Sequence, residues 1–166
     1  MTSLKKYKIK KGKHDAGFDF APFYGKTVSK YEVIFTSSCI YDLHDEDQYD
    51  INKLFGLSYL YHHNNSARFG WRSTGDRIEI SAYCYINGKR YFEDICLIET
   101  GRMYSMELRN TGDYYEFKVA NSEGILNLCL KIKKPKTSKL GYKLFPYFGG
   151  NKTAPHDMKI LMRKIK

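Results

Sequence analysis

The chain has 166 residues, of which 42% are hydrophobic and 16% aromatic, and it carries a formal net charge of +10. This length suits one domain, residues 1–166, which buries about 70% of its unfolded surface and folds without metal or disulfide staples. No apolar run approaches the ~20 residues of a membrane span, and no secretion signal opens the chain. Unless a leader has been removed, we expect a cytoplasmic protein with no membrane partner.

The excess positive charge is concentrated at the two ends of the chain. Six lysines lie between Lys5 and Lys13, and the segment from Lys131 to Lys166 contains Asp157 as its only acidic residue. If both ends belong to one sheet, their field attracts polyanions such as nucleotides, nucleic acids or acidic polysaccharides. The alternative is a charged surface that only keeps the protein soluble.

Short alternating segments separated by Gly, Asn, Asp and Ser recur from end to end, with no amphipathic helical window of convincing length. This pattern, together with the aromatic content, is typical of an all-β, single-domain antiparallel β-sandwich. The predicted strands are residues 5–11, 18–24, 30–41, 53–60, 66–72, 77–86, 90–98, 103–109, 114–119, 125–133, 140–148 and 157–165.

Two turns are predicted by their residue types. Asn87 and Gly88 tolerate positive φ, which fits a two-residue hairpin between the strands 77–86 and 90–98. A further hairpin turn is expected at residues 111–113, where the sequence reads Thr-Gly-Asp.

The predicted strand 66–72 alternates without a break between two kinds of residue. One face is apolar and aromatic, and the other carries Ser66, Arg68 and Arg72. Two guanidinium groups held on a rigid sheet form a surface that can bind anions. The alternative is a solvated outer face that happens to be basic.

The next predicted strand, 77–86, has the same design. Its apolar face alternates with a polar face that includes Tyr83 and Tyr85. Sequential strands neighbour one another roughly two-thirds of the time, and if these two strands lie in one sheet, the tyrosines and Arg68 could form one continuous patch. The sequence does not show whether the Arg68 and Tyr83 faces share one groove.

Metal and cofactor motifs are weak or absent. The acid-rich loop from Asp42 to Asp50 lacks the glycine and terminal glutamate of a calcium-binding loop. His62 and His63 would point to opposite sides of an extended chain, and no third ligand lies at useful spacing. No Walker loop, dinucleotide fingerprint or Gly-x-Ser-x-Gly elbow occurs. We therefore expect no metal and no cofactor.

Two further segments contain candidate binding residues. The aromatic stretch from Gly141 to Gly150 is either core or, through Tyr147, a stacking platform for a sugar or a base. His14 and His156 lie near opposite ends of the chain and could meet in space, although a lone histidine is more often structural.

Four ordered pieces of the chain carry a resemblance. They are Asn52–Leu57, Ser66–Arg72, Tyr83–Tyr85 and Phe145–Gly150. They resemble the Lys-Leu-Pro-Gly-Leu, Ser-x-Arg-x-x-Trp-Arg, Tyr-x-Tyr and Phe-x-Gly-Gly motifs of the small β-jelly-roll polyuronate lyases, of the alginate and glucuronan type. The resemblance extends over residues 30–165 and implies a concanavalin A-like jelly roll with a concave groove.

The resemblance also implies catalytic roles. In β-elimination a cation neutralises the uronate carboxylate and stabilises the enolate-like intermediate, a role that fits Arg68 or Lys53. A tyrosine activated by neighbouring positive charge then serves as base and as acid to the leaving oxygen, and Tyr85 or Tyr83 fits this role. The candidate ligand-binding residues are Ser66, Arg72, Asn52, Tyr147 and His156.

Departures from the family pattern leave catalysis open. Phe55 stands where the family has proline, the chain is shorter than the typical enzyme, and no secretion signal is present. The main prediction is therefore binding of an anionic ligand, an acidic polysaccharide first, in a basic tyrosine-lined groove, with cleavage as one outcome.

The alternatives are non-catalytic. An intracellular protein could use the same groove to sequester a nucleotide or another phosphate ligand. Arg68, Arg72 and Lys53 would then pair with phosphate, and Tyr83 or Tyr85 would stack on a base. A protein-interaction module with no small ligand is the third alternative.

Overall fold

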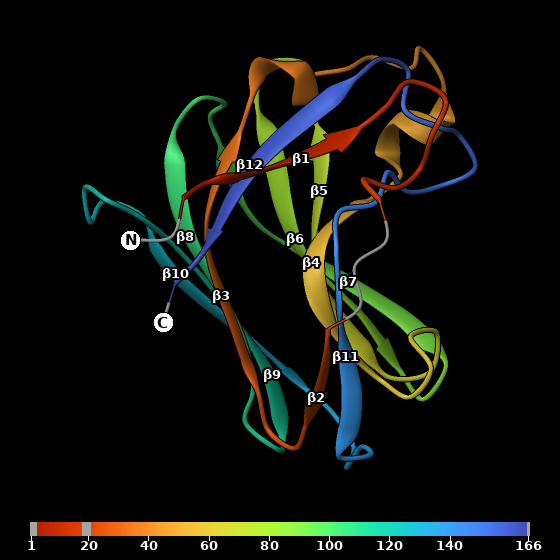
Figure 1. The fold of residues 1–166 in the computed structure, drawn as a ribbon, viewed down its shortest axis with the longest axis vertical. Helices are drawn as coiled ribbons and strands as arrows, with labels where there is room; N and C mark the ends of the chain where they lie inside the picture. Colours follow the sequence, from red (N-terminus) through yellow and green to blue (C-terminus); the bar gives the residue numbers. More distant parts are fainter. Residues whose placement is uncertain (1–2, 18–20, 166) are drawn as a thin grey trace.

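The computed structural model describes residues 3–17 and 21–165. In this part of the chain, two six-stranded antiparallel sheets pack face to face as a β-sandwich (Figure 1). We call them the β3 sheet and the β5 sheet, after the strands β3 (Val28–Phe35) and β5 (Ser66–Ser73) that they contain. Two short 3-10 turns, η1 (Ser37–Cys39) and η2 (Glu46–Tyr49), lie between β3 and β4.

Neighbouring strands within each sheet are often distant in sequence, as in a jelly roll. The β3 sheet has the order β1 (Lys5–Ile9), β12 (Met158–Lys164), β3 (Val28–Phe35), β8 (Met103–Asn110), β9 (Tyr114–Asn121) and β10 (Asn127–Lys133). The β5 sheet has the order β2 (Pro22–Tyr24), β11 (Leu140–Leu144), β4 (Asn52–Tyr59), β5 (Ser66–Ser73), β6 (Ile78–Ile86) and β7 (Lys89–Ile98).

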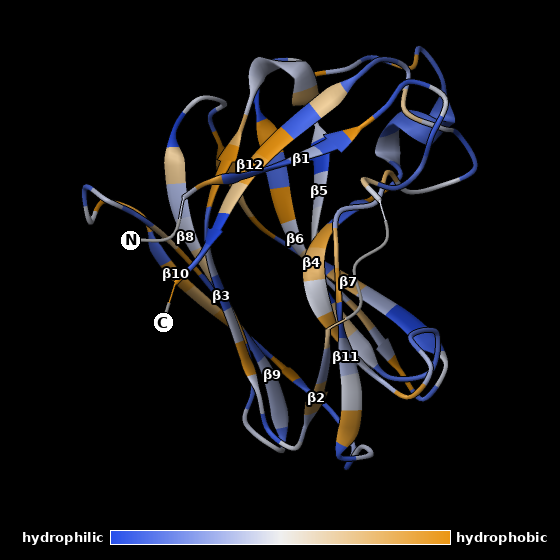
Figure 2. Cartoon of the chain, viewed as in Figure 1, coloured by the Kyte–Doolittle hydropathy of each residue, from blue (hydrophilic) through white to orange (hydrophobic). Residues whose placement is uncertain are grey.

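The core lies between the two sheets and is rich in aromatic side chains. Phe69 of β5 meets Phe117 of β9 with ring centroids 5.1 Å apart, and Trp71 meets Phe35 of β3 at 5.3 Å. Full burial of one such side chain stabilises the fold by roughly 1.5–3 kcal/mol. Figure 2 shows the corresponding alternation of apolar and polar residues along the strands. This packing fixes which face of β5 points outward.

The predicted all-β sandwich is confirmed, and each of the twelve predicted strands has a counterpart with shifted ends. The prediction for 30–41 is too long, because the chain turns into η1 after Phe35. The prediction for 140–148 is also too long: the strand ends at Leu144, and Pro146 has no N–H to donate to a sheet. Strand β2 begins at Pro22, and residues 18–20 of that prediction lie outside the described residues.

The predicted turns are present. Asn87 and Gly88 both have positive φ, at 51° and 77°, as the two-residue hairpin between β6 and β7 requires. Residues 111–113 connect β8 to β9. Among the described residues, no helix is long and apolar enough to cross a membrane.

Candidate functional site

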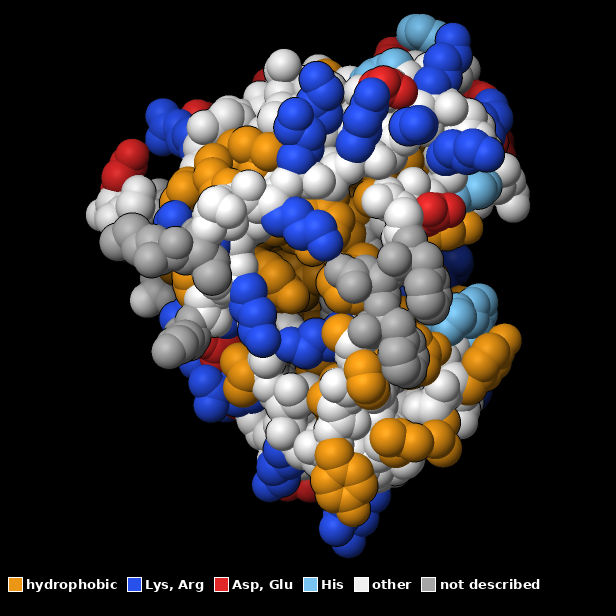
Figure 3. All heavy atoms as spheres, viewed as in Figure 1, with side chains coloured by type: hydrophobic (Ala, Val, Ile, Leu, Met, Phe, Trp, Pro, Cys, Tyr) orange, Lys and Arg blue, Asp and Glu red, His pale blue; other side chains and the backbone are white. Residues whose placement is uncertain are grey.

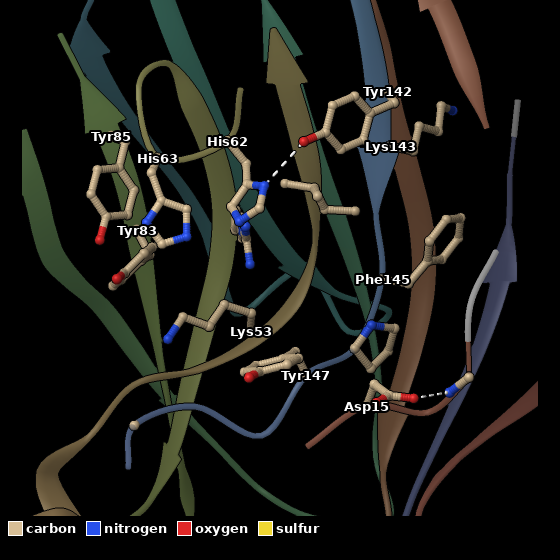
Figure 4. A pocket seen from close by; sticks show the side chains of 15 residues that line it. Asp15, Lys53, His62, His63, Tyr83, Tyr85, Tyr142, Lys143, Phe145 and Tyr147 are labelled. Carbon is tan, nitrogen blue, oxygen red and sulfur yellow. Dashed lines mark hydrogen bonds between the residues drawn. The ribbon is translucent and has the colours of Figure 1, made fainter. Parts of the chain in front are cut away.

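A cavity of about 710 Å³ opens on the outward face of the β5 sheet. Strands β4, β5, β6 and β11 supply its floor, and three connecting segments, residues 14–17, 60–65 and 145–150, supply its walls. Figure 4 shows the side chains that line it. We call this cavity the pocket.

The strand register brings the predicted catalytic residues together. Arg68 of β5 lies directly opposite Tyr83 of β6, and Ser66 lies opposite Tyr85. Residues that face each other across antiparallel strands point to the same side of the sheet. Arg68 and the two tyrosines therefore lie on one face of the β5 sheet, and all three line the pocket.

Lys53 enters the pocket from β4, where the pairing with β5 is irregular between Lys53 and Gly56. Its Nζ lies 4.6 Å from the centroid of the Tyr83 ring, a cation–π distance. Burial, and then the nearby charge of Arg68, lowers the pKa of Lys53 to about 8. The ammonium group is thus charged at neutral pH at an energetic cost that a bound anion would relieve.

Arg68 is largely buried, yet its Nε has no hydrogen-bond partner in the described part of the chain. Burial lowers the pKa of its guanidinium, and the neighbouring tyrosines oppose this effect. Gly56 lies opposite Arg68, and a Cβ on this glycine would approach Arg68 Cγ to 2.7 Å. Glycine at position 56 therefore leaves room beside β4 for the Arg68 side chain, which lines the pocket.

The two tyrosines differ in their surroundings. Their ring centroids are 5.9 Å apart, but Tyr83 is buried beneath Lys53 whereas Tyr85 is partly exposed. Burial, followed by hydrogen bonding and charge interaction with Tyr85, raises the pKa of Tyr83 to about 12. The resemblance implies a tyrosine activated by neighbouring positive charge, but at Tyr83 burial outweighs the effect of that charge on the pKa.

Two histidines of the pocket are not among the binding residues predicted from the sequence. The sequence predicts that His62 and His63 lie on opposite sides of an extended chain, as weak candidates for metal ligands, but both line the pocket. The chain is not extended there, since Leu60 has φ 61° and turns the loop back over the sheet. The signal available in the sequence was the short loop between two strands that each carry a pocket cation.

Each histidine contacts a pocket tyrosine. His62 Nδ1 lies 3.0 Å from the Tyr142 hydroxyl (Figure 4), and the His63 ring centroid is 5.1 Å from that of Tyr85. Burial, then the charges of Arg68 and His63, lowers the pKa of His62 to about 4. His62 is therefore neutral at pH 7. No group of three or more potential metal ligands comes together in the described residues.

Tyr147 also lines the pocket, so the stretch from Gly141 to Gly150 serves two purposes. Phe148 is buried in the core, while Tyr147 is 37% exposed. The Tyr147 ring stacks on His14 with centroids 5.2 Å apart. Its backbone bonds to Lys53, with N–O distances of 2.8 and 2.9 Å, which fixes Tyr147 relative to the pocket cation.

Two of the expected ligand-binding residues have structural contacts instead. Asn52 is buried, where its amide donates to the Tyr41 hydroxyl and its Oδ1 accepts from the Gly149 N–H, both at 2.7 Å. Ser66 is also buried, and its hydroxyl donates to the His62 carbonyl at 2.6 Å. Neither residue lines the pocket, although both hold segments that do.

Two other predicted ligand-binding residues, Arg72 and His156, lie away from the pocket. Arg72 contacts Glu79 at 2.5 Å and Asp94 at 3.2 Å, so its charge is already neutralised. It borders a smaller cavity of about 340 Å³. His156 bonds through Nε2 to the Ser38 carbonyl at 2.8 Å rather than meeting His14. We therefore assign no ligand contact to either residue.

The sequence matches no protein-family model and no curated protein. The structure is similar to the alginate lyase from Klebsiella pneumoniae, with a TM-score of 0.61 and 10% identity over 88% of this chain and 59% of that one. The structure is also similar to the marine alginate lyase from Zobellia galactanivorans, with a TM-score of 0.53 and 13% identity over 86% of this chain and 62% of that one. A functionally unknown protein from Saccharomyces cerevisiae has a similar structure, with a TM-score of 0.59 and 10% identity over 97% of this chain and 88% of that one.

This chain thus spans about three fifths of the length of the two lyases it matches. Identities this low carry information on the fold alone. At that level the resemblance noted in the sequence is confirmed: the chain has a jelly-roll, polysaccharide lyase-like fold.

Proposed function

We propose that the pocket binds a stretch of acidic polysaccharide and cleaves it by β-elimination. The observation that carries this proposal is a largely buried Arg68 that lines the pocket with Lys53 and two tyrosines and whose Nε has no partner among the described residues. Buried cations without acidic partners are costly unless an anion joins them. The similarity of the fold to two alginate lyases supports a polyuronate as that anion.

Arg68 and Lys53 would hold the carboxylate of one uronic acid unit. Pairing with the carboxylate withdraws electron density from the adjacent carbon and acidifies its proton. The same two cations stabilise the enolate-like intermediate that forms when this proton leaves. The low-dielectric setting of the pocket strengthens this stabilisation.

Tyr85 is the proton carrier that the geometry favours, because it is the more exposed tyrosine of the pair. Its phenolate would take the proton from the carbon next to the carboxylate, leaving the electron pair to form a carbon–carbon double bond. The bond from the β carbon to the glycosidic oxygen then breaks, and that oxygen takes a proton from the tyrosine. Two shorter chains result, one with an unsaturated end, and no water is consumed.

The test is to incubate the protein with alginate and with glucuronan, and to follow the ultraviolet absorbance of the unsaturated product. We expect Tyr85→Phe to lower turnover by about 10²–10⁴-fold while preserving binding. Tyr83→Phe, two residues earlier on the same strand, is the matched control, and its turnover should fall less than that of Tyr85→Phe. Turnover that is unchanged in Tyr85→Phe would remove this residue from the mechanism.

A second candidate function is binding of a nucleotide without cleavage. It is supported by a ladder of rings at one end of the pocket: the centroids of Tyr61 and His63 are 5.4 Å apart, and those of His63 and Tyr85 are 5.1 Å apart. Such rings can stack on a base while Arg68 holds a phosphate. A rise in melting temperature with nucleotides and none with polyuronates would favour this function.

A further inference from the structure

A row of exposed lysines lies outside the pocket on the edge of the β3 sheet. Figure 3 shows lysine and arginine side chains gathered over β1, β12 and the adjoining loops. We call the following set the lysine track: Lys6, Lys10, Lys11, Lys13 and Lys159.

The alternation of β1 sets the orientation of this track. Tyr7 and Ile9 are buried against the core, so the lysines between and beyond them face solvent. In the pairing of β1 with β12, Lys8 lies directly opposite Lys159. Lys8 is already paired with Asp157 and is therefore left out of the track, whereas Lys159 opposite it belongs to the track.

The track has few acidic neighbours. Asp157 contacts the Lys8 ammonium at 2.6 Å and accepts from the Lys11 backbone N–H at 2.9 Å. Within residues 3–17 and 21–165, no member of the track forms a salt bridge. By contrast, exposed Lys152 in a nearby loop contacts both Asp45 and Asp47. The track lysines thus retain their capacity to pair with a ligand.

The track is continuous in sequence with one wall of the pocket. The residue after Lys13 is His14, whose ring stacks on Tyr147 of the pocket wall. The next residue, Asp15, bridges to Tyr147 and lines the pocket itself. The turn that carries Lys11 and Lys13 is held in place by backbone bonds of 2.9 Å from Gly12 to Ala154 and 3.0 Å from Ala154 to Lys13.

We infer that the lysine track is a second binding surface for the same acidic polysaccharide, holding the part of the chain that leaves the pocket past Tyr147. This inference rests on the proposed function, because it needs a polyanionic polymer in the pocket. Contacts along the track add to those in the pocket without ordering a second molecule, so a long chain gains affinity that a short one does not. Exposed lysines act over about 10 Å at 0.1 M salt, which makes the added affinity salt-dependent.

The experiment compares a long alginate chain with an alginate trisaccharide, which is short enough to stay in the pocket. The track variant carries Lys6→Glu, Lys10→Glu and Lys13→Glu. The control variant carries Lys118→Glu, Lys133→Glu and Lys136→Glu, which changes the net charge equally on exposed residues elsewhere in the molecule.

We expect the track variant to weaken binding of the long chain about tenfold at low salt, with the difference vanishing at high salt. Trisaccharide binding should stay within about twofold of the unmodified protein, and the control variant should behave like the unmodified protein. Asp15→Asn removes the carboxylate at the junction and should strengthen long-chain binding about twofold.

Four results would overturn the inference. Equal losses in the track and control variants would show an effect of net charge alone. If the track variant binds long alginate as the unmodified protein does but no longer binds duplex DNA, the track is a nucleic-acid-binding surface instead. A track variant that binds the long chain as tightly as the unmodified protein does would overturn this inference and leave the proposed function standing. If the unmodified protein binds neither the trisaccharide nor the long chain, the proposed function falls and this inference falls with it.

Discussion

Two arginines on the same face of β5, four residues apart, have opposite surroundings. Arg72 sits between Glu79 and Asp94 on the next two strands, at 2.5 and 3.2 Å. Among the described residues, Arg68 has no acidic partner and its Nε makes no hydrogen bond, and its charged and polar neighbours include tyrosines and Lys53. Arg72 is thus a structural cation, whereas Arg68 is available to a ligand.

The same contrast separates the two sheets. On the outer face of the β3 sheet, away from the lysine track, several arginines and lysines have acidic partners, as in the pairs Arg163–Glu32, Arg109–Glu107 and Lys131–Glu116. In the pocket of the β5 sheet, Asp15 is the only acidic residue among those that the structure describes in the lining. A charge that already has a partner indicates a solvated surface, and a buried charge without one indicates a binding site.

The largest expected effect comes from replacing each arginine by methionine, which keeps the apolar stem and removes the charge. Arg68→Met should weaken binding of an alginate oligosaccharide by about 100-fold or more, because it removes a charge-assisted pairing in a buried setting. Arg72→Met should change this binding by less than about threefold. Titration calorimetry on both variants measures the difference.

The two variants should also differ in stability, with opposite signs. Arg72→Met leaves Glu79 and Asp94 without their partner and should lower the free energy of unfolding by about 1–2 kcal/mol. Arg68→Met removes a poorly solvated, unpaired charge and should leave that free energy unchanged or raise it by up to ~1 kcal/mol. Equal losses of stability in urea unfolding would contradict the distinction drawn between the two residues.

The sequence predicts the sandwich because burial enforces the period-2 alternation of each strand. It also places Arg68 and Arg72 on one face correctly, but it treats them as equivalent. What separates them lies across the sheet: Glu79 reaches Arg72 only through the register of β5 with β6, and Asp94 only through a third strand. Local alternation carries no information on these cross-strand partners.

The pocket histidines show a second limit of the same kind. His62 faces the pocket because Leu60 adopts a left-handed backbone conformation, which is uncommon for a leucine. His156 and Asn52 show the converse, since nothing in their local sequence indicates that Ser38 and Gly149 satisfy them. Loop conformation and hydrogen bonds between distant segments decide these cases.

A smaller effect is expected from giving Arg68 and Arg72 the same surroundings. The double variant Glu79→Gln, Asp94→Asn removes both acidic partners of Arg72 while keeping the size of the side chains. Arg72 then becomes available to an anion at the far end of β5, and binding of a long alginate chain should strengthen about three- to tenfold at low salt. Unchanged affinity, measured with the trisaccharide as control, would show that Arg72 is out of reach of the bound chain.

The lowered pKa of Lys53 predicts a proton linked to binding. The free protein has a Lys53 pKa of about 8, so at pH 9 most molecules have lost this proton. A bound carboxylate favours the charged ammonium and raises the pKa, so binding at pH 9 should take up somewhat less than about one proton. At pH 6 the uptake should be close to zero. Calorimetry in two buffers with different ionisation heats measures it, and Lys53→Met should abolish it.

The smallest expected effect is the influence of each arginine on His62. Burial, then the charge of Arg68, then His63 lowers the pKa of His62 to about 4. Arg68→Met removes the second cause, so the pKa should rise, but it should stay below the ordinary value of 6.5 because burial remains. Arg72→Met should leave it unchanged, which imidazole resonances followed by NMR between pH 4 and 7 can establish, with His62→Gln for assignment.

Because folding lowers the pKa of His62, the free energy of unfolding depends on pH. Between pH 6.5 and about 4 the unfolded chain binds a proton at His62 that the folded protein resists, so the free energy of unfolding falls as pH falls through this window. His62 is only partly buried, so after allowance for solvent screening the loss is about 1 kcal/mol or less. Arg68→Met should make this loss smaller and Arg72→Met should not, since the unpaired charge of Arg68 is the one that acts on His62. A pH dependence that is identical in the two variants would show that the field of Arg68 does not extend to His62.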